Sequence, residues 1–211
     1  MTDFKKIIAV LGGTFDPVHL GHLHAARSVA EALAAAEVQL MPTAAPPHKA
    51  PPLASAADRL AMLELAVAGE ARLGVSTLEL QRQGPSYTYL TLRQIRQQHG
   101  AGCEIAWIVG LDMLADLPMW RCADEVVEQA RIIAVARPPA PADYSDLRRR
   151  LARRFGPERA ETLIGGILAI EPLDISSTEI RRRCVAGRSI EGLTPPAVAD
   201  YIARRGLYRQ D

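Results

Sequence analysis

Residues 5–22 read KKIIAVLGGTFDPVHLGH, and this stretch decides the fold. It begins with a short apolar, β-branched run over residues 5–11, which is typical of a buried strand. The run stops at Gly12-Gly13, and residues 20–36 then carry apolar side chains at helical spacing. We therefore predict a strand, a turn and a helix. In open α/β sheets, ligands bind at such a turn, outside the carboxyl end of a strand.

The same alternation of apolar runs and helical patterns continues along the chain. Further strands are predicted over 38–41, 73–80, 104–109, 131–136 and 167–170. Further helices are predicted over 55–68, 87–99, 143–155, 176–186 and up to 205, with another ending near 126–129. Strands separated by helices of this length imply right-handed crossovers and a mostly parallel sheet. The pattern therefore predicts an α/β fold.

Local signals mark the ends of three of these helices. Capping boxes open two of them, at Ser55-x-x-Asp58 and Ser176-x-x-Glu179. The last helix is expected to use Thr194 as its N-cap and Pro195 as its first residue, and to stop at Gly206.

Length and composition bound the class of protein. The chain has 211 residues, which favours one domain. The proline-rich segment 138–142 is expected to join a core of about 1–137 to a C-terminal part of about 143–211. With 25 Lys and Arg against 24 Asp and Glu, the net charge of +1 argues against a broad nucleic-acid-binding surface. Any anionic ligand must therefore be held by a few local groups.

No apolar stretch of about 18 residues is present, so no transmembrane helix is expected. Cys103, Cys122 and Cys184 are widely spaced and form no CxxC pair. This usage suits a reducing, cytoplasmic protein and argues against a zinc site.

The glycine turn and two histidines form the strongest candidate site. Gly12 and Gly13 allow backbone amides to approach a phosphate, and the following helix N-terminus adds partial positive charge. His19 and His22 are three residues apart, so both project on one side of the helix start. Imidazoles beside a polyphosphate can donate hydrogen bonds to oxygens that gain charge. The alternatives are a histidine pair that only caps the helix, or a zinc site, which lacks a third ligand nearby.

A second candidate anion site is the segment 175–181, ISSTEIR. Ser177 and Thr178 lie at a predicted helix N-terminus, and Arg181 follows one turn later. A plain capping box explains Ser176 and Glu179 but not the other three residues. Both interpretations stay open at this point.

Three more positions carry candidate chemistry. Lys49 is the only lysine after residue 6 and lies in a proline-rich loop, although an ordinary solvated loop is the alternative. Asp112 follows the 104–109 strand, where a carboxylate could bind a ribose hydroxyl. Trp120 could stack on a heteroaromatic ring or be buried in the core.

GGTFDPVHLGH together with ISSTEIR resembles the nucleotidyltransferase superfamily, with its (T/H)xGH signature and C-terminal [ST]xxxR element. The intervening segments resemble bacterial nicotinate mononucleotide adenylyltransferases over nearly the whole chain. In order, these segments are MPTAAPPHK, DRLAMLELA, PSYTYLTL, GLDMLADLPMW, ARP and TPPAVADYIARRGLY. One departure is Leu111, where the family commonly has a small residue.

The resemblance implies a single Rossmann-like, three-layer nucleotidyltransferase domain with a small C-terminal helical part. It implies that nicotinate mononucleotide attacks the α-phosphate of ATP. It assigns catalysis to His19, His22 and Arg181. The implied ATP-binding residues are Gly12, Gly13, Thr14, Phe15, Gly21, Gly110, Asp112, Ile175, Ser177 and Thr178. The implied mononucleotide-binding residues are Lys49, Tyr87, Thr88, Trp120 and Arg137.

The resemblance also implies Mg²⁺ held mainly by phosphates, with no protein metal site. The expected partners are these two small molecules, without nucleic acid or membrane, and the expected assembly is a monomer or a weak homo-oligomer. Three alternatives stay open: a related enzyme acting on nicotinamide mononucleotide, one acting on phosphopantetheine, or a non-catalytic nucleotide sensor.

Overall fold

The computed structural model describes residues 7–46, 50–100, 102–136, 143–171 and 173–209. Within these residues, six strands form one sheet in the order β3-β2-β1-β4-β5-β6, and every neighbouring pair is parallel. The strands are β1 (Ile7–Gly13), β2 (Val38–Pro42), β3 (Leu73–Val75), β4 (Glu104–Gly110), β5 (Arg131–Ala136) and β6 (Ile167–Ala169). This order reverses direction at β1, which is the topological switch point of doubly wound α/β folds. The predicted α/β fold with a parallel sheet is confirmed.

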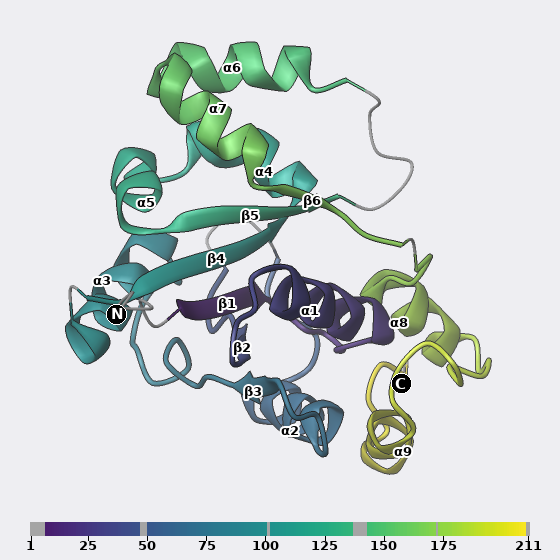
Figure 1. Cartoon of the computed structure of the whole chain (residues 1–211). Helices are drawn as coiled ribbons and strands as arrows, with labels where there is room; N and C mark the ends of the chain where they lie inside the picture. The colour runs from purple at the N-terminus through teal and green to yellow at the C-terminus, as the bar shows by residue number, and fades with distance from the viewer. Residues whose placement is uncertain (1–6, 47–49, 101, 137–142, 172, 210–211) are drawn as a thin grey trace.

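Helices connect the strands and cover the two faces of the sheet (Figure 1). They are α1 (Leu20–Ala32), α2 (Ala56–Val67), α3 (Thr88–His99), α4 (Leu111–Asp116), α5 (Ala123–Gln129), α6 (Ser145–Phe155), α7 (Pro157–Gly165), α8 (Ser177–Val185) and α9 (Pro196–Arg205). A short 3₁₀ turn, η1 (Leu117–Met119), follows α4. In Figure 1, α8 lies beside the end of α1 where that helix begins, far from it in sequence, and α9 packs against α2.

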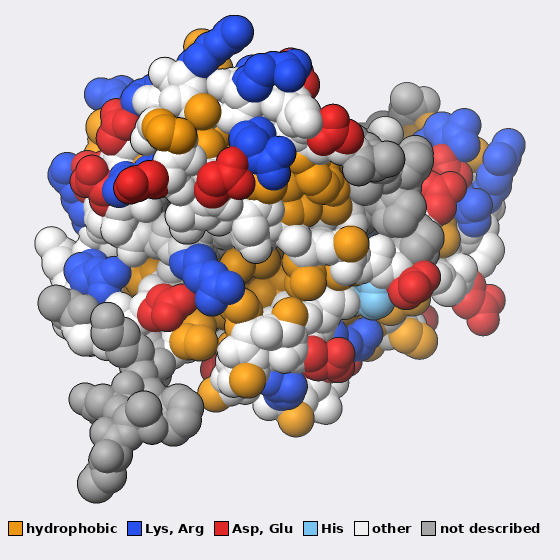
Figure 2. Space-filling model, turned by 45° about the horizontal axis from the view of Figure 1, so that its top comes forward, with side chains coloured by type: hydrophobic (Ala, Val, Ile, Leu, Met, Phe, Trp, Pro, Cys, Tyr) orange, Lys and Arg blue, Asp and Glu red, His pale blue; other side chains and the backbone are white. Residues whose placement is uncertain are grey.

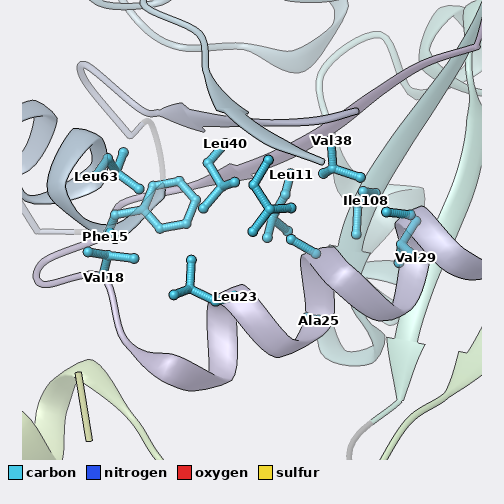
Figure 3. Close-up of a cluster of buried hydrophobic side chains, with 14 of the residues drawn as sticks. Leu11, Phe15, Val18, Leu23, Ala25, Val29, Val38, Leu40, Leu63 and Ile108 are labelled. Carbon is cyan, nitrogen blue, oxygen red and sulfur yellow. The ribbon is translucent and has the colours of Figure 1, made fainter. Parts of the chain in front are cut away.

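Alternating side chains of the strands feed two separate hydrophobic clusters. In β1, Ala9 and Leu11 belong to one cluster, while Val10 belongs to the other. The first cluster packs the sheet against α1, α2 and α9, and Figure 3 shows Leu23 and Val29 of α1 facing the strand residues Leu11 and Val38. The second packs the opposite face against α3 to α7. A sheet buried on both faces explains why its strands are apolar throughout.

Several predicted boundaries are wrong for physical reasons. The strand expected over 73–80 ends at Val75, because only its first three residues pair with β2. The final helix begins at Pro196 with Pro195 as its N-cap, one residue later than expected. The Thr194 hydroxyl donates instead to the carbonyl oxygen of Val18 at 2.8 Å. Helices α4 and α7 were not predicted. The two serine caps are confirmed, since the hydroxyls of Ser55 and Ser176 each accept from the backbone amide three residues later.

The surface carries charges of both signs. Figure 2 shows basic and acidic side chains interspersed over one face, as expected for a net charge of +1. Many of these are arginine–carboxylate pairs, such as Arg154 with Asp124 at 2.6 Å. No helix in the described part of the chain is long and apolar enough to cross a membrane.

Candidate active site

The turn between β1 and α1 is tightly built. Phe15 has a φ of 50°, in the left-handed region that few side chains adopt, and its ring is buried. The ring lies against Gly13, where an added Cβ would come within 3.0 Å of Phe15 Cζ. Figure 3 shows Phe15 and Val18 beside Leu63 of α2 and Leu23 of α1. A Cβ at position 13 would therefore press on the Phe15 ring, which favours glycine there.

The two histidines stack on each other at the start of α1. Their ring centroids are 3.7 Å apart with 27° between the planes. The rings of Phe15 and His22 make an edge-to-face contact with their centroids 4.9 Å apart. His19 is the N-cap and is buried, while His22 is partly exposed. The Nδ1 atom of His22 accepts from the backbone amide of His19 at 3.3 Å. In the neutral ring this bond leaves the proton on Nε2, which is then a donor.

Side chains from later in the chain bind successive carbonyl groups of the turn. Arg59 donates to the carbonyl oxygen of Thr14 at 2.8 Å, and Arg181 donates to that of Asp16 at 2.7 Å. Ser177 donates to the carbonyl oxygen of Pro17, as Thr194 does to that of Val18, each at 2.8 Å. Four of the five carbonyl groups over 14–18 are thus held from outside the turn.

The carboxylate of Asp16 is buried and accepts three hydrogen bonds. The donors are the backbone amides of Leu53 and Ala54, at 2.8 and 3.1 Å, and the hydroxyl of Tyr208, at 2.7 Å. The Arg59 side chain is also buried; burial lowers its pKa, and the charge of Asp16 opposes that shift. The turn therefore rests on a charged, fully packed interior.

The N-terminus of α8 lies against the same turn. The carbonyl oxygen of Ile175 is 3.7 Å from the position that a Cβ on Gly21 would occupy. Thr178 is exposed, and its Oγ1 lies 3.4 Å from Nη2 of Arg181. The structure thus brings ISSTEIR and the histidine pair together.

A cavity of about 190 Å³ lies at the carboxyl ends of β1 and β4, where Gly12 and Gly13 form part of its wall. Its described lining includes the predicted residues Gly12, Gly13, Thr14, Tyr87, Thr88, Gly110 and Trp120. Its only described Lys or Arg is Arg121, whose guanidinium lies 5.0 Å from the centroid of the Tyr87 ring. The cavity therefore combines the indoles of Trp107 and Trp120, a phenol ring, glycines, the Glu79 carboxylate and the Arg121 guanidinium.

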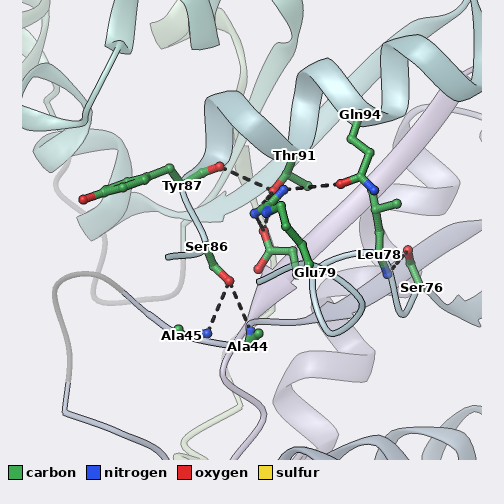
Figure 4. Close-up of polar contacts among 10 residues, drawn as sticks. Ala44, Ala45, Ser76, Leu78, Glu79, Ser86, Tyr87, Thr91 and Gln94 are labelled. Carbon is green, nitrogen blue, oxygen red and sulfur yellow. Dashed lines mark hydrogen bonds and ion pairs between the residues drawn. The ribbon is translucent and has the colours of Figure 1, made fainter. Parts of the chain in front are cut away.

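Polar contacts fix the loop that carries Tyr87. The Ser86 hydroxyl accepts from the amides of Ala44 and Ala45, at 3.2 and 3.3 Å (Figure 4). Glu79, which also lines the cavity, is buried and accepts from the Thr91 hydroxyl at 2.6 Å. This carboxylate is thus held by α3 as part of the cavity wall.

The predicted residues fall into two neighbouring groups that share the glycine turn. One group lies around the start of α1, outside the lining of the cavity, and consists of Phe15, His19, Gly21, His22, Ile175, Ser177, Thr178 and Arg181. Asp112 is exposed in the first turn of α4, with its Oδ1 beside Gly110. Lys49 and Arg137 lie outside the described residues, and so does the expected linker 138–142.

Sequence reasoning missed the residues that hold the turn. Asp16 lies inside the GGTFDPVHLGH segment, and Tyr208 ends TPPAVADYIARRGLY, but no spacing relates residues so far apart. Arg59 lies inside the helix predicted over 55–68, where no local pattern marks it. Arg121 could have been found, since it directly follows Trp120.

A cavity at the carboxyl ends of parallel strands, next to a helix N-terminus, defines a doubly wound α/β protein of the nucleotide-binding class. A family model described as cytidylyltransferase-like matches residues 10–183. A probable nicotinate-nucleotide adenylyltransferase of Pseudomonas fluorescens is 43% identical over 97% of this chain and 98% of its own. One of Pseudomonas aeruginosa is 41% identical over the same shares. The chain belongs to the cytidylyltransferase-like family and, within it, to the nicotinate-nucleotide adenylyltransferases.

Two solved structures are similar in fold. One is a Plasmodium falciparum nicotinic acid mononucleotide adenylyltransferase complexed with NaAD, with a TM-score of 0.75, 19% identity and coverage of 96% of this chain and 97% of the other. The second is a putative nicotinate-nucleotide adenylyltransferase from Vibrio parahaemolyticus, with a TM-score of 0.64, 20% identity and coverage of 98% and 97%. At these identities they support the fold.

Proposed function

We propose that this chain transfers the adenylyl group of ATP to nicotinate mononucleotide, giving nicotinate adenine dinucleotide and pyrophosphate, a step of NAD biosynthesis. The observation that carries the proposal is the stacked pair His19 and His22 at the end of the glycine turn. The glycines at the start of the same turn line a cavity with an indole wall. The names of the Pseudomonas relatives support the same substrate pair.

ATP would bind across the start of α1. The amides after Gly12 and Gly13 and the α1 N-terminus would face its phosphates, where the helix dipole favours negative charge. Arg181 keeps Nη2 toward exposed Thr178 while Nη1 holds Asp16, which suits it to grip the triphosphate. Gly21 would leave room for the nucleoside, and Gly110 and Asp112 would face its ribose. Phe15, Ile175 and Ser177 would support this site from the sides.

The mononucleotide would occupy the cavity. Trp120 would stack on the pyridine ring, and the Tyr87–Thr88 segment at the start of α3 would bind its carboxylate through backbone amides and a hydroxyl. The family resemblance adds Lys49 and Arg137 to this pocket as further predictions.

The chemistry would be an in-line displacement that needs no protein nucleophile. The phosphate of nicotinate mononucleotide is already anionic near neutral pH, so the protein has only to position it and to stabilise charge at the α-phosphate. His22 suits this role because its Nδ1 accepts from the His19 amide, which leaves the proton of the neutral ring on Nε2 as a donor. Such donors act on charge that develops in the transition state.

Mg²⁺ would enter with ATP. No group of three or more His, Cys, Asp or Glu among the described residues could hold a metal ion. Mg²⁺ commonly keeps water and phosphate ligands, so we expect an ion that is carried by the triphosphate. When bound, the ion would supply positive charge that offsets the charge of the phosphates.

The test is pyrophosphate release from ATP with a panel of acceptors: nicotinate mononucleotide, nicotinamide mononucleotide and phosphopantetheine. We expect the highest kcat/KM with nicotinate mononucleotide, and nicotinate adenine dinucleotide as the product identified by mass. Release only with phosphopantetheine would contradict the proposal. Binding of ATP without release with any acceptor would indicate a nucleotide sensor.

A further inference from the structure

The hydroxyl of Tyr208 reaches the turn between β1 and α1 from the far end of the described chain. It donates to Oδ1 of Asp16 at 2.7 Å, although the two residues are 192 positions apart. Both side chains are buried. Tyr208 has a φ of 61°, in the left-handed region, so its backbone adopts a costly conformation to place the ring there.

Asp16 is the point where three segments meet. Its carboxylate also accepts from the amides of Leu53 and Ala54, which lead directly into the cap of α2. Its own carbonyl oxygen accepts from Arg181. Asp16 is thus fixed at both its side chain and its main chain, three residues before His19.

The Tyr208 hydroxyl is well suited to act as a permanent donor. Burial raises its pKa, with a further rise from the hydrogen bond to Asp16, so the proton stays on the oxygen at physiological pH. Without it, Oδ1 of Asp16 would keep one backbone amide at 3.1 Å and lose its shortest bond. A buried carboxylate that loses a donor reorients or draws in water.

We propose that Tyr208 is a positioning residue for adenylyl transfer: by orienting the Asp16 carboxylate it fixes the 14–18 turn and thereby the histidine pair. The inference rests on the proposed function, because the histidines act on that reaction. The Tyr208 hydroxyl acts on the placement of the reacting groups. Its removal should therefore lower kcat more than it raises KM for either substrate.

The chain contains a matched control. Tyr201, on α9, donates to Oδ1 of Asp58 on α2 at 2.9 Å. This is a second tyrosine–aspartate hydrogen bond from the same C-terminal segment. Asp58 forms hydrogen bonds with Ser55, Tyr201 and Arg205, none of which belongs to the 14–18 turn. Tyr201→Phe therefore removes a similar bond without touching the turn.

The experiment compares Tyr208→Phe and Tyr201→Phe in the full chain. We expect Tyr208→Phe to lower kcat about tenfold with KM for ATP and nicotinate mononucleotide within about twofold, since misplacement of reacting groups by about 1 Å can cost 10²-fold. Tyr201→Phe should keep the wild-type kcat at a similar loss of Tm. A wild-type kcat in Tyr208→Phe, or an equal loss of kcat in both variants, would overturn the inference.

A second measurement needs no substrate. We expect hydrogen exchange at the amides of Leu53 and Ala54 to accelerate in Tyr208→Phe and to stay unchanged in Tyr201→Phe. Unchanged exchange in Tyr208→Phe would overturn the inference. Turnover by the wild-type protein tests the proposed function separately, so failure of one does not imply failure of the other.

Discussion

The hydroxyl of Ser177 donates to the carbonyl oxygen of Pro17 at 2.8 Å, across 160 positions of the sequence. Ser177 and its neighbour Thr178 were predicted together as triphosphate ligands, yet their surroundings differ. The proton of Ser177 is engaged in holding the turn, whereas Thr178 is exposed beside Arg181. The two hydroxyls should therefore contribute in different ways.

Replacing these two residues separates the roles. We expect Ser177→Ala to lower the free energy of unfolding by about 1 kcal/mol, the usual net value of one hydrogen bond. Thr178→Val should leave stability nearly unchanged and raise KM for ATP. Urea unfolding and steady-state kinetics measure both effects. A Ser177→Ala protein of wild-type stability would show that the hydrogen bond to Pro17 does not contribute to the free energy of unfolding.

His22→Ala should reduce kcat strongly with a modest change in KM. The expected loss is about 10²–10³-fold, typical for removal of one donor that stabilises transition-state charge. His22→Gln, whose amide nitrogen can replace the Nε2 donor, should recover part of the activity. Rates of pyrophosphate release at saturating substrate measure this, and near-wild-type turnover by His22→Ala would exclude the proposed role.

Gly21→Ala should separate activity from stability. Alanine is favoured over glycine in a helix by about 1 kcal/mol. Here, however, the added Cβ would lie 3.0 Å from Nδ1 of His19 and must displace that ring. We expect kcat to fall while the free energy of unfolding changes little, as judged by kinetics and thermal unfolding. An active, stabilised variant would show that the ring can move without consequence.

Arg121 should contribute to the choice of pyridine substrate. It is the only Lys or Arg among the described residues that line the cavity, and nicotinate carries a negative charge that nicotinamide lacks. We expect Arg121→Gln to lower kcat/KM for nicotinate mononucleotide several-fold more than for nicotinamide mononucleotide.

The control for Arg121 is Arg93→Gln. Arg93 also lies over a tyrosine ring, that of Tyr89 at 5.3 Å, but it does not line the cavity. The ratio of kcat/KM for the two mononucleotides should stay at the wild-type value. Equal losses for both substrates in Arg121→Gln would contradict a charge-based preference.

Acid should weaken the contact between α2 and α9. The Ser55 hydroxyl, with Tyr201 and Arg205, lowers the pKa of Asp58 against the opposing effect of burial. A lowered folded-state pKa stabilises the fold above the unfolded value of about 3.9 and loses that effect as pH falls through the folded value. Wild type should exceed Asp58→Asn in unfolding free energy at pH 7, with the gap closing below about pH 4. A gap independent of pH would contradict this.

The periodic parts of the fold were predictable from sequence. Each strand carries apolar residues on both faces, and the caps Ser55 and Ser176 act locally, so a window of a few residues contains the signal. The short helix α4 was missed because its six residues follow β4 without a loop. Helix α7 was missed because only Gly156 separates it from α6.

The candidate site was predictable where its residues lie in one segment. His19, His22 and Gly13 lie within a single turn, and ISSTEIR marks a helix start, so spacing alone marked both segments as candidates. The bonds from Arg59, Thr194 and Tyr208 to the turn depend on tertiary packing and leave no local pattern. The last helix begins one residue later than predicted because the Thr194 hydroxyl donates to the carbonyl oxygen of Val18. Pro195, and not Thr194, is then the N-cap.

The bond between Tyr208 and Asp16 also sets the order in which the site can mature during synthesis. The ribosome makes the glycine turn and both histidines before it makes residue 208, so β1 can pair with β2 while that residue is still missing. Until that tyrosine has emerged, the carboxylate it binds has no hydroxyl partner and can remain hydrated. On the role proposed for Tyr208, a chain that stops before residue 208 contains the glycine turn and both histidines but lacks the geometry that the bond to Asp16 provides.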